Sequence, residues 1–123
     1  ISLPKGEEMR FATVHFALDQ ATRLIQAGET LAYLDSDLPV VLTGDFNAEP
    51  HTEEMELLSQ NYTMADSNLG YTFPVVNPVK KIDYIWGSKD CFLQSPKIQI
   101  PLSIKYSDHL PLMADILLTC TSK

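Results

Sequence analysis

Residues 40–47 read Val-Val-Leu-Thr-Gly-Asp-Phe-Asn, and this stretch decides the fold. Its first three residues are a continuous apolar run, which is typical of a strand buried on both faces of a sheet. The run leads to a carboxylate at Asp45 and a carboxamide at Asn47. Because side chains two residues apart in a strand point the same way, we expect both groups to face one site at the end of the strand, where open α/β sheets bind ligands. A simple strand-ending turn is the alternative, since Gly, Asp and Asn are common in turns.

The sequence before this stretch predicts a strand followed by a helix. Residues 11–16 are β-branched and aromatic, as strands are. Asp19 is placed to cap a helix that stops near residues 35–37. The apolar residues at helical spacing are Ala21, Leu24, Ile25, Gly28, Leu31 and Ala32. The polar residues expected on the opposite side are Arg23, Gln26 and Glu29.

The sequence after this stretch predicts a second helix and then mostly strands. Residues 50–52 open the helix, and Glu53 and Glu54 fall in its first turn, where the helix dipole favours negative charge. Residues 61–79 are rich in Asn, Gly and Pro and are expected to form mostly loop. Further strands are expected at 82–86, 92–100 and 112–118. Helices and strands that alternate first, with strands dominating later, predict an α/β protein with a sheet covered by helices on one face.

Two further motifs contain groups that can do chemistry. Asp83 lies within an apolar strand, where a carboxylate is costly unless it is paired; a surface ion pair with Lys80 or Lys81 is the alternative to a functional role. The step Ser107-Asp108-His109 forms either a simple turn or a place where a metal-binding carboxylate meets an imidazole. These neighbours diverge in direction and cannot form a hydrolase triad among themselves. No Gly-x-Ser-x-Gly elbow occurs in the chain, so a serine hydrolase is disfavoured.

The remaining histidines have ordinary explanations when each is taken alone. His15 lies in an apolar strand, where a lone histidine is more often structural and hydrogen-bonded than catalytic. His51 precedes the second helix and is expected to be a solvated residue at its cap.

The order of the motifs along the chain is more specific than any one of them. A histidine near a first strand is followed by Gly-Asp-Phe-Asn at 44–47, Ile-Asp-Tyr-Ile at 82–85 and Ser-Asp-His at 107–109. This pattern resembles the endonuclease/exonuclease/phosphatase superfamily, which includes exonuclease III-like nucleases, pancreatic-type deoxyribonucleases, sphingomyelinases and inositol polyphosphate phosphatases. The resemblance runs from about Phe11 to Leu118, and Thr72-Phe73-Pro74 is a further, weaker match.

The resemblance implies roles for the motif residues. Asp45 would orient or deprotonate the attacking water, Asn47 would hold a phosphate oxygen, and His109 would act as general base or transition-state stabiliser. The choice of base between Asp45 and His109 stays open. Asp83 would hydrogen-bond His109 and fix its tautomer.

The resemblance also implies a metal ion and a second histidine at the phosphate. Asp108 would bind or orient the ion, and His15 would stabilise the charge that develops on the phosphate. Mg²⁺ or Mn²⁺ suits oxygen ligands, and the sequence has no thiolate cluster that would suggest zinc.

The family fold is a four-layer α/β/β/α sandwich built from two similar halves. We expect residues 1–123 to be the C-terminal half, a mixed sheet with helices on one face, with the N-terminal half absent. The first half of the family supplies an Asn and a metal-binding Glu, and Glu7 and Glu8 lack the context of that Glu. The chain is therefore expected to be a metal-dependent phosphoesterase that is incomplete for catalysis alone. The alternative is a non-catalytic fragment or degenerate module that assembles with a partner half.

Charge narrows the expected partners. The chain has 9 Lys plus Arg against 16 Asp plus Glu, which gives a net charge of -7. Binding to nucleic acid by charge alone needs a basic face, so a small-molecule or lipid-like phosphate ester is the expected substrate. No stretch is apolar for long enough to form a transmembrane segment. One sheet face left uncovered by helices predicts contact with the missing N-terminal half or a homodimer.

Overall fold

The structure is a computed structural model that describes residues 1–66, 70–89 and 91–120, except for the side chains of 91–95 and 118–120. Its elements are β1 (Arg10–His15), α1 (Gln20–Leu34), β2 (Val40–Asp45), α2 (Glu53–Ser59), β3 (Tyr62–Met64), β4 (Asp83–Ser88), β5 (Cys91–Gln99) and β6 (Met113–Cys120). The main sheet has the strand order β1-β2-β4-β3. β1 is parallel to β2, and the other neighbouring pairs are antiparallel.

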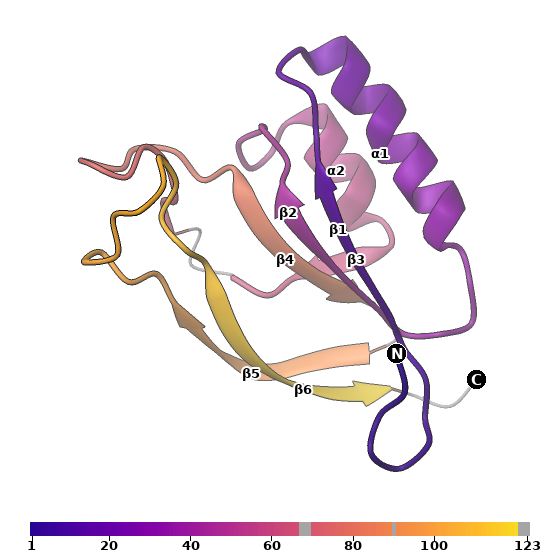
Figure 1. Ribbon diagram of the computed structural model, residues 1–123. Helices are drawn as coiled ribbons and strands as arrows, with labels where there is room; N and C mark the ends of the chain where they lie inside the picture. Colours follow the sequence, from indigo (N-terminus) through magenta and orange to yellow (C-terminus); the bar gives the residue numbers. More distant parts are fainter. Residues whose placement is uncertain (67–69, 90, 121–123) are drawn as a thin grey trace.

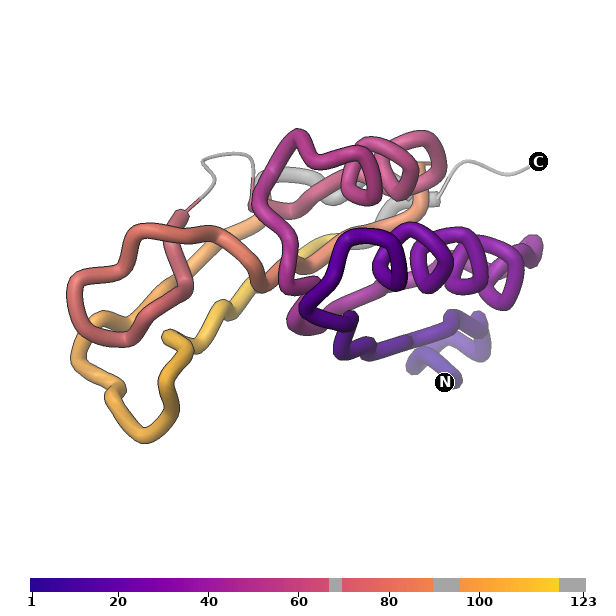
Figure 2. Tube along the Cα trace, turned by 90° about the horizontal axis from the view of Figure 1, so that it is seen from above, coloured from indigo at the N-terminus to yellow at the C-terminus, as the bar shows by residue number. Residues whose placement is uncertain are grey.

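Helices α1 and α2 lie side by side on one face of the main sheet (Figure 1), as the view from above also shows (Figure 2). β5 and β6 form a separate antiparallel pair on the other side of that sheet (Figure 1), and a groove of about 550 Å³ lies between the sheet face and β6. The predicted α/β class, with a mixed sheet and helices on one face, is confirmed. Among the described residues, none of the helices combines the length and the apolar character that crossing a bilayer requires.

Helix α1 begins where the sequence predicts. The side chain of Asp19 accepts hydrogen bonds from the backbone N–H of Thr22 at 2.9 Å and from its hydroxyl at 2.6 Å, which satisfies donors that the first turn leaves free. The helix then buries Ala27 against the sheet, and Leu31 and Leu34 pack at the edge of the same core. This packing holds α1 against the core on one face of the sheet.

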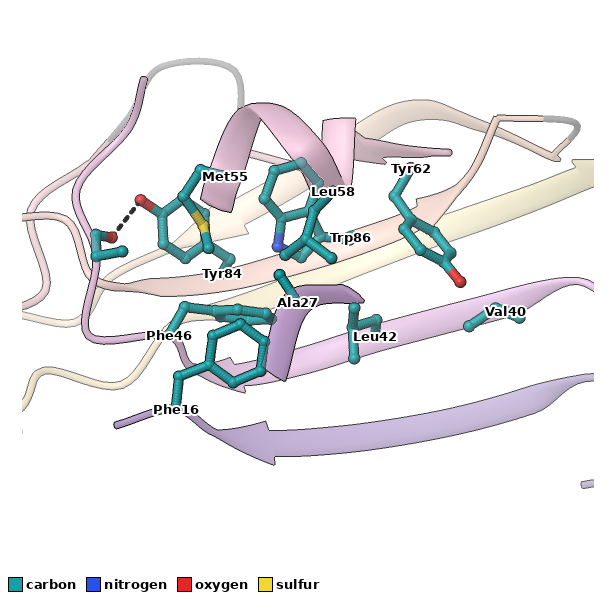
Figure 3. Close-up of a cluster of buried hydrophobic side chains, with 11 residues drawn as sticks. Phe16, Ala27, Val40, Leu42, Phe46, Met55, Leu58, Tyr62, Tyr84 and Trp86 are labelled. Atoms are coloured by element: carbon teal, nitrogen blue, oxygen red, sulfur yellow. Dashed lines mark hydrogen bonds between the residues drawn. The ribbon is translucent and has the colours of Figure 1, made fainter. Parts of the chain in front are cut away.

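The core between the helices and the sheet is largely aromatic on its sheet side (Figure 3). Phe46 contacts the rings of Phe16, Tyr84 and Trp86 edge-on, with ring centroids 5.0, 5.4 and 6.3 Å apart. The Tyr84 hydroxyl donates to the carbonyl of Ala48 at 2.7 Å, so its buried polar atom is satisfied. Phe46 follows Asp45 directly, and this cluster therefore anchors the end of β2.

A buried ion pair joins the two helices, and its position differs from the sequence prediction. Arg23, expected on the outer side of α1, is only 12% exposed and donates its Nε to Glu54 Oε1 at 2.6 Å. Glu54 is completely buried and also accepts from Gln20 at 3.1 Å. Burial raises the pKa of Glu54, but its hydrogen bonds, chiefly the one from Arg23, lower that pKa by more. The pKa of Glu54 therefore lies below the ordinary value. The stability from this pair is therefore present at neutral pH and lost as the pH falls through the folded-state pKa of Glu54.

Replacing Arg23 by Met should destabilise the chain by about 3–5 kcal/mol, because the Glu54 carboxylate would stay buried without its partner. Urea unfolding followed through the fluorescence of Trp86, the single tryptophan, measures the change. The double variant Arg23→Met/Glu54→Leu is the control and should recover most of the loss. Equal losses in both variants would contradict the ion-pair explanation.

Two other features of the fold were not expected from the sequence. β3 lies within the segment predicted to be mostly loop and pairs with β4 from Tyr62 to Met64. Gly44 has a φ of +144° and packs against β1, so closely that an added Cβ would lie 2.0 Å from the carbonyl oxygen of Val14. The close approach of β1 to β2 therefore needs a residue without a side chain at Gly44.

Candidate active site

Three of the predicted site residues form a row across three strands. His15 at the end of β1 is the register partner of Asp45 in β2, and Asp45 is the register partner of Asp83 in β4. The Nε2 atom of His15 lies 3.6 Å from Asp45 Oδ2. The His15 side chain is 78% exposed, which does not fit a structural histidine held within the sheet. The ordinary pairing of the sheet is enough to bring these groups together.

The predicted hydrogen bond between Asp83 and His109 is present. His109 Nδ1 lies 2.8 Å from Asp83 Oδ2, and the Thr72 hydroxyl donates to the same oxygen at 2.6 Å. The alternative, a surface ion pair between the Asp83 carboxylate and a neighbouring lysine, does not describe Lys81. Its Nζ is buried and donates to the main-chain oxygen of Asp83 at 2.9 Å and to the carboxylate of Asp66 at 3.3 Å.

His109 reaches into the cleft with its other ring nitrogen. Its Nε2 lies 3.5 Å from Asp45 Oδ2 and 4.0 Å from Asp108 Oδ1, while the ring packs against Phe73 with centroids 4.9 Å apart. Burial lowers the pKa of His109, but the hydrogen bond to Asp83 and the charges of Asp83, Asp45 and Asp108 raise it by more. The net result is a raised pKa, because three carboxylates favour the imidazolium form.

Asn47 lies at the same site as Asp45, but it is not part of the strand from which the sequence analysis expected both side chains to point the same way. β2 ends at Asp45, and Asn47 follows in a turn with a φ of 49°. Its backbone N–H donates to Asp45 Oδ1 at 2.9 Å, and its side-chain amide donates to the carbonyl of Phe16 at 2.7 Å. Asn47 therefore ties the ends of β1 and β2 together and also lines the cleft.

All six predicted site residues line one cleft of about 970 Å³; they are His15, Asp45, Asn47, Asp83, Asp108 and His109. Phe73, Lys80 and Gln26 also line it. Asp108 is 79% exposed at the edge. His51 is exposed before α2 and pairs with Glu56 at 3.3 Å, in line with the solvated cap position expected for it. Glu7 and Glu8 precede β1 at the end of the strand opposite His15, and neither lines the cleft, so neither takes the place of the Glu expected from a first half-domain.

The donor set of the cleft is compatible with a cation. Asp45, Asp83 and His109 each offer one ligand atom, and these atoms lie within 4.8 Å of one another. Carboxylate oxygens are the donors that Mg²⁺ and Mn²⁺ prefer.

Thr72 is the site residue to which the sequence assigned no role. It is completely buried between Asp83 and the segment that carries His109. Thr72-Phe73-Pro74 was noted only as a weak family match. The loop around Thr72 is rich in Gly, Pro and Asn, and no pattern in its sequence indicates that Thr72 is buried.

Comparisons with known proteins agree with this fold. A family model described as "Endonuclease/Exonuclease/phosphatase family" matches residues 8–109. A mannosyl-6-phosphatase structure from Bacteroides thetaiotaomicron is 19% identical with a TM-score of 0.74, and the match covers 91% of this chain and 52% of that one. The human Nocturnin catalytic domain with bound sulfate is 23% identical with a TM-score of 0.68, over 94% of this chain and 49% of that one.

A truncated TDP2 from Caenorhabditis elegans is 19% identical with a TM-score of 0.58, over 85% of this chain and 52% of that one. None of the curated protein sequences matches the chain. The chain spans about half the length of the solved structures it resembles. The family match covers most of the chain and includes every residue of the cleft named above, so the chain belongs to the endonuclease/exonuclease/phosphatase family.

Proposed function

We propose that this chain supplies the histidine–aspartate side of a divalent-metal-dependent phosphoesterase site. The observation that carries the proposal is the contact chain Asp83–His109–Asp45, with 2.8 Å from Asp83 Oδ2 to His109 Nδ1 and 3.5 Å from His109 Nε2 to Asp45 Oδ2. A carboxylate only accepts hydrogen bonds, so it fixes the proton of a neutral His109 on Nδ1 and turns the Nε2 lone pair toward Asp45.

The reaction is hydrolysis by direct attack of water on phosphorus. The oxygen–phosphorus bond to water forms as the bond to the leaving oxygen breaks. The leaving oxygen departs with the electron pair of the broken bond. The proton of the water passes to Asp45 or to His109, whose facing atoms lie 3.5 Å apart. Asn47 and His15 line the same cleft and are suited to hold the phosphate oxygens on which negative charge develops.

The metal ion belongs on the oxygen donors of this cleft. Asp83 Oδ2 is already occupied by Thr72 and His109, which leaves Asp108 and Asp45 as the carboxylates best placed to hold Mg²⁺ or Mn²⁺. When bound, the ion supplies positive charge that stabilises the phosphate in the transition state. Because the chain spans about half of its solved relatives, we assign the complete ligand set and the activity to the protein in which a first half-domain joins this one.

The substrate we propose is a small or lipid-like phosphate ester. The cleft has room for a molecule of that size. Lys80 lines the cleft and offers a positive charge to a phosphate group. The net charge of -7 does not favour a nucleic acid backbone, whose binding depends on many lysine and arginine contacts.

Chelation tests the proposal. We expect the protein to hydrolyse an activated ester such as bis(p-nitrophenyl) phosphate or p-nitrophenyl phosphate with Mg²⁺ or Mn²⁺, and excess EDTA should abolish the reaction. Re-adding Mg²⁺ in excess of the chelator is the control and should restore the rate. The 123-residue chain assayed without a first half-domain should show much lower activity. Hydrolysis that continues at the full rate in EDTA would overturn metal dependence.

A further inference from the structure

Thr72 contacts the histidine–aspartate pair through its side chain. The Thr72 hydroxyl donates to Asp83 Oδ2 at 2.6 Å, the same atom that meets His109 Nδ1 at 2.8 Å. The hydroxyl oxygen in turn accepts from the backbone N–H of Asp83 at 3.3 Å and of Ile82 at 3.4 Å. These two donors direct the hydroxyl hydrogen of Thr72 toward the carboxylate, because the oxygen accepts from the main chain on its other side.

Thr72 also contacts the chain next to His109 through its main chain. Its carbonyl oxygen accepts from the backbone N–H of Leu110 at 2.7 Å, and its N–H donates to the carbonyl of Lys80 at 2.8 Å. One completely buried residue therefore holds the carboxylate of Asp83 and the segment that carries His109. The distance between the carboxylate and the imidazole depends on both contacts.

The main chain of Asp83 is fixed separately. Lys81 Nζ, which is buried, donates to the Asp83 carbonyl at 2.9 Å and is held by Asp66 at 3.3 Å. Removing the Thr72 hydroxyl takes away one contact of the Asp83 N–H, but the Lys81 contact and the pairing of Asp83 with Asp45 in β2 remain. The larger effect therefore falls on the rotation of the carboxylate.

We propose that Thr72 is a positioning residue that sets the orientation of the Asp83 carboxylate and, through it, the tautomer of His109. The proposal rests on the proposed phosphoesterase function for its catalytic consequence. Without the Thr72 hydroxyl, Asp83 Oδ2 loses one of its two donors and the carboxylate turns more freely. The imidazole of His109 then no longer has one fixed ring orientation, and its Nε2 faces Asp45 for only part of the time.

The test compares Thr72→Val, which keeps the shape but removes the hydroxyl, with Thr72→Ser, which keeps the hydroxyl. Changes to groups that orient a functional histidine typically cost about 10–100-fold in activity. We expect Thr72→Val to lower kcat on p-nitrophenyl phosphate esters by about 10-fold or more with little change in KM, and Thr72→Ser to stay within about threefold of the unchanged protein.

A second readout does not depend on activity. Two-bond ¹H–¹⁵N correlation spectra, recorded at a pH where the imidazole is neutral, report which ring nitrogen of His109 carries the proton. His109→Ala assigns the signals among the three histidines. We expect a single Nδ1–H tautomer in the unchanged protein and in Thr72→Ser, and a mixture of tautomers in Thr72→Val.

The two readouts separate the possible failures. If no phosphoester is hydrolysed but the tautomer shifts only in Thr72→Val, the proposed function fails and the positioning role stands. If Thr72→Val keeps both the tautomer and kcat, or if Thr72→Ser loses them as fully as Thr72→Val, the positioning role is overturned. Should Thr72→Val not fold, as judged by the fluorescence of Trp86, Thr72→Ala takes its place with the same expected results.

Discussion

Replacing His109 by Ala should lower kcat/KM by on the order of 10²-fold or more, because the proposed mechanism would lose its proton-transfer or charge-stabilising group. Replacing Asp45 by Ala should cause a loss of the same order, since its carboxylate lies 3.5 Å from His109 Nε2 and shares the cleft. The measurement is steady-state hydrolysis of an activated phosphate ester with saturating Mg²⁺ or Mn²⁺.

His51→Ala is the matched control for these variants. His51 is exposed, pairs only with Glu56 among its described contacts, and does not line the cleft, so its removal should leave kcat/KM unchanged. Because residues that act as a unit are not additive, the double variant Asp45→Ala/His109→Ala should lose little more than either single variant. Activity within a few-fold of normal in His109→Ala would rule out the mechanism.

Replacing Gly44 by Ala should prevent the native fold or destabilise it by more than about 4–5 kcal/mol, the range reached only by severe core defects. The added Cβ would lie 2.0 Å from the Val14 carbonyl oxygen, and a φ of +144° is unfavourable for any residue with a side chain. β1 and β2 would have to separate at the point where His15 meets Asp45. Urea unfolding followed through Trp86 fluorescence measures the loss.

Gly28→Ala is the matched control for this substitution. Gly28 lies within α1, and an added Cβ there meets nothing within 4 Å. The same change should stabilise the chain by about 0.5–1 kcal/mol, because alanine is the better helix former. A Gly44→Ala variant as stable as Gly28→Ala would show that β1 and β2 do not approach each other as the structure has them.

The sequence predicted the parts of the site that follow from strand order. Asp45 and Asp83 end or begin strands, and pairing of those strands places them side by side with His15. The hydrogen bond from His109 to Asp83 was expected from the motif order and is present. The roles of these residues in catalysis stay predictions.

What the sequence did not predict depends on contacts between distant segments. Helical spacing placed Arg23 on the outer side of α1, because the sequence does not show that α2 brings Glu54 against it. β3 has three residues, too short for a recognisable alternation. Apolar runs identified β5 and β6 as strands, but they carry no information about which sheet each strand joins. Thr72 gains its two contacts only when the chain folds back on β4 and on Leu110.

His15, Asp45 and Asp83 form a row across β1, β2 and β4. Inserted residues therefore affect the site differently in a loop and within a strand. Extra residues in the surface connection between α1 and β2 leave the strand pairing intact, and lengthening such a loop costs little free energy. A single residue inserted within β2 would instead rotate every following side chain to the opposite face and carry the Asp45 carboxylate from the cleft toward the core. The geometry of the site therefore tolerates a longer α1–β2 connection but not one more residue within β2.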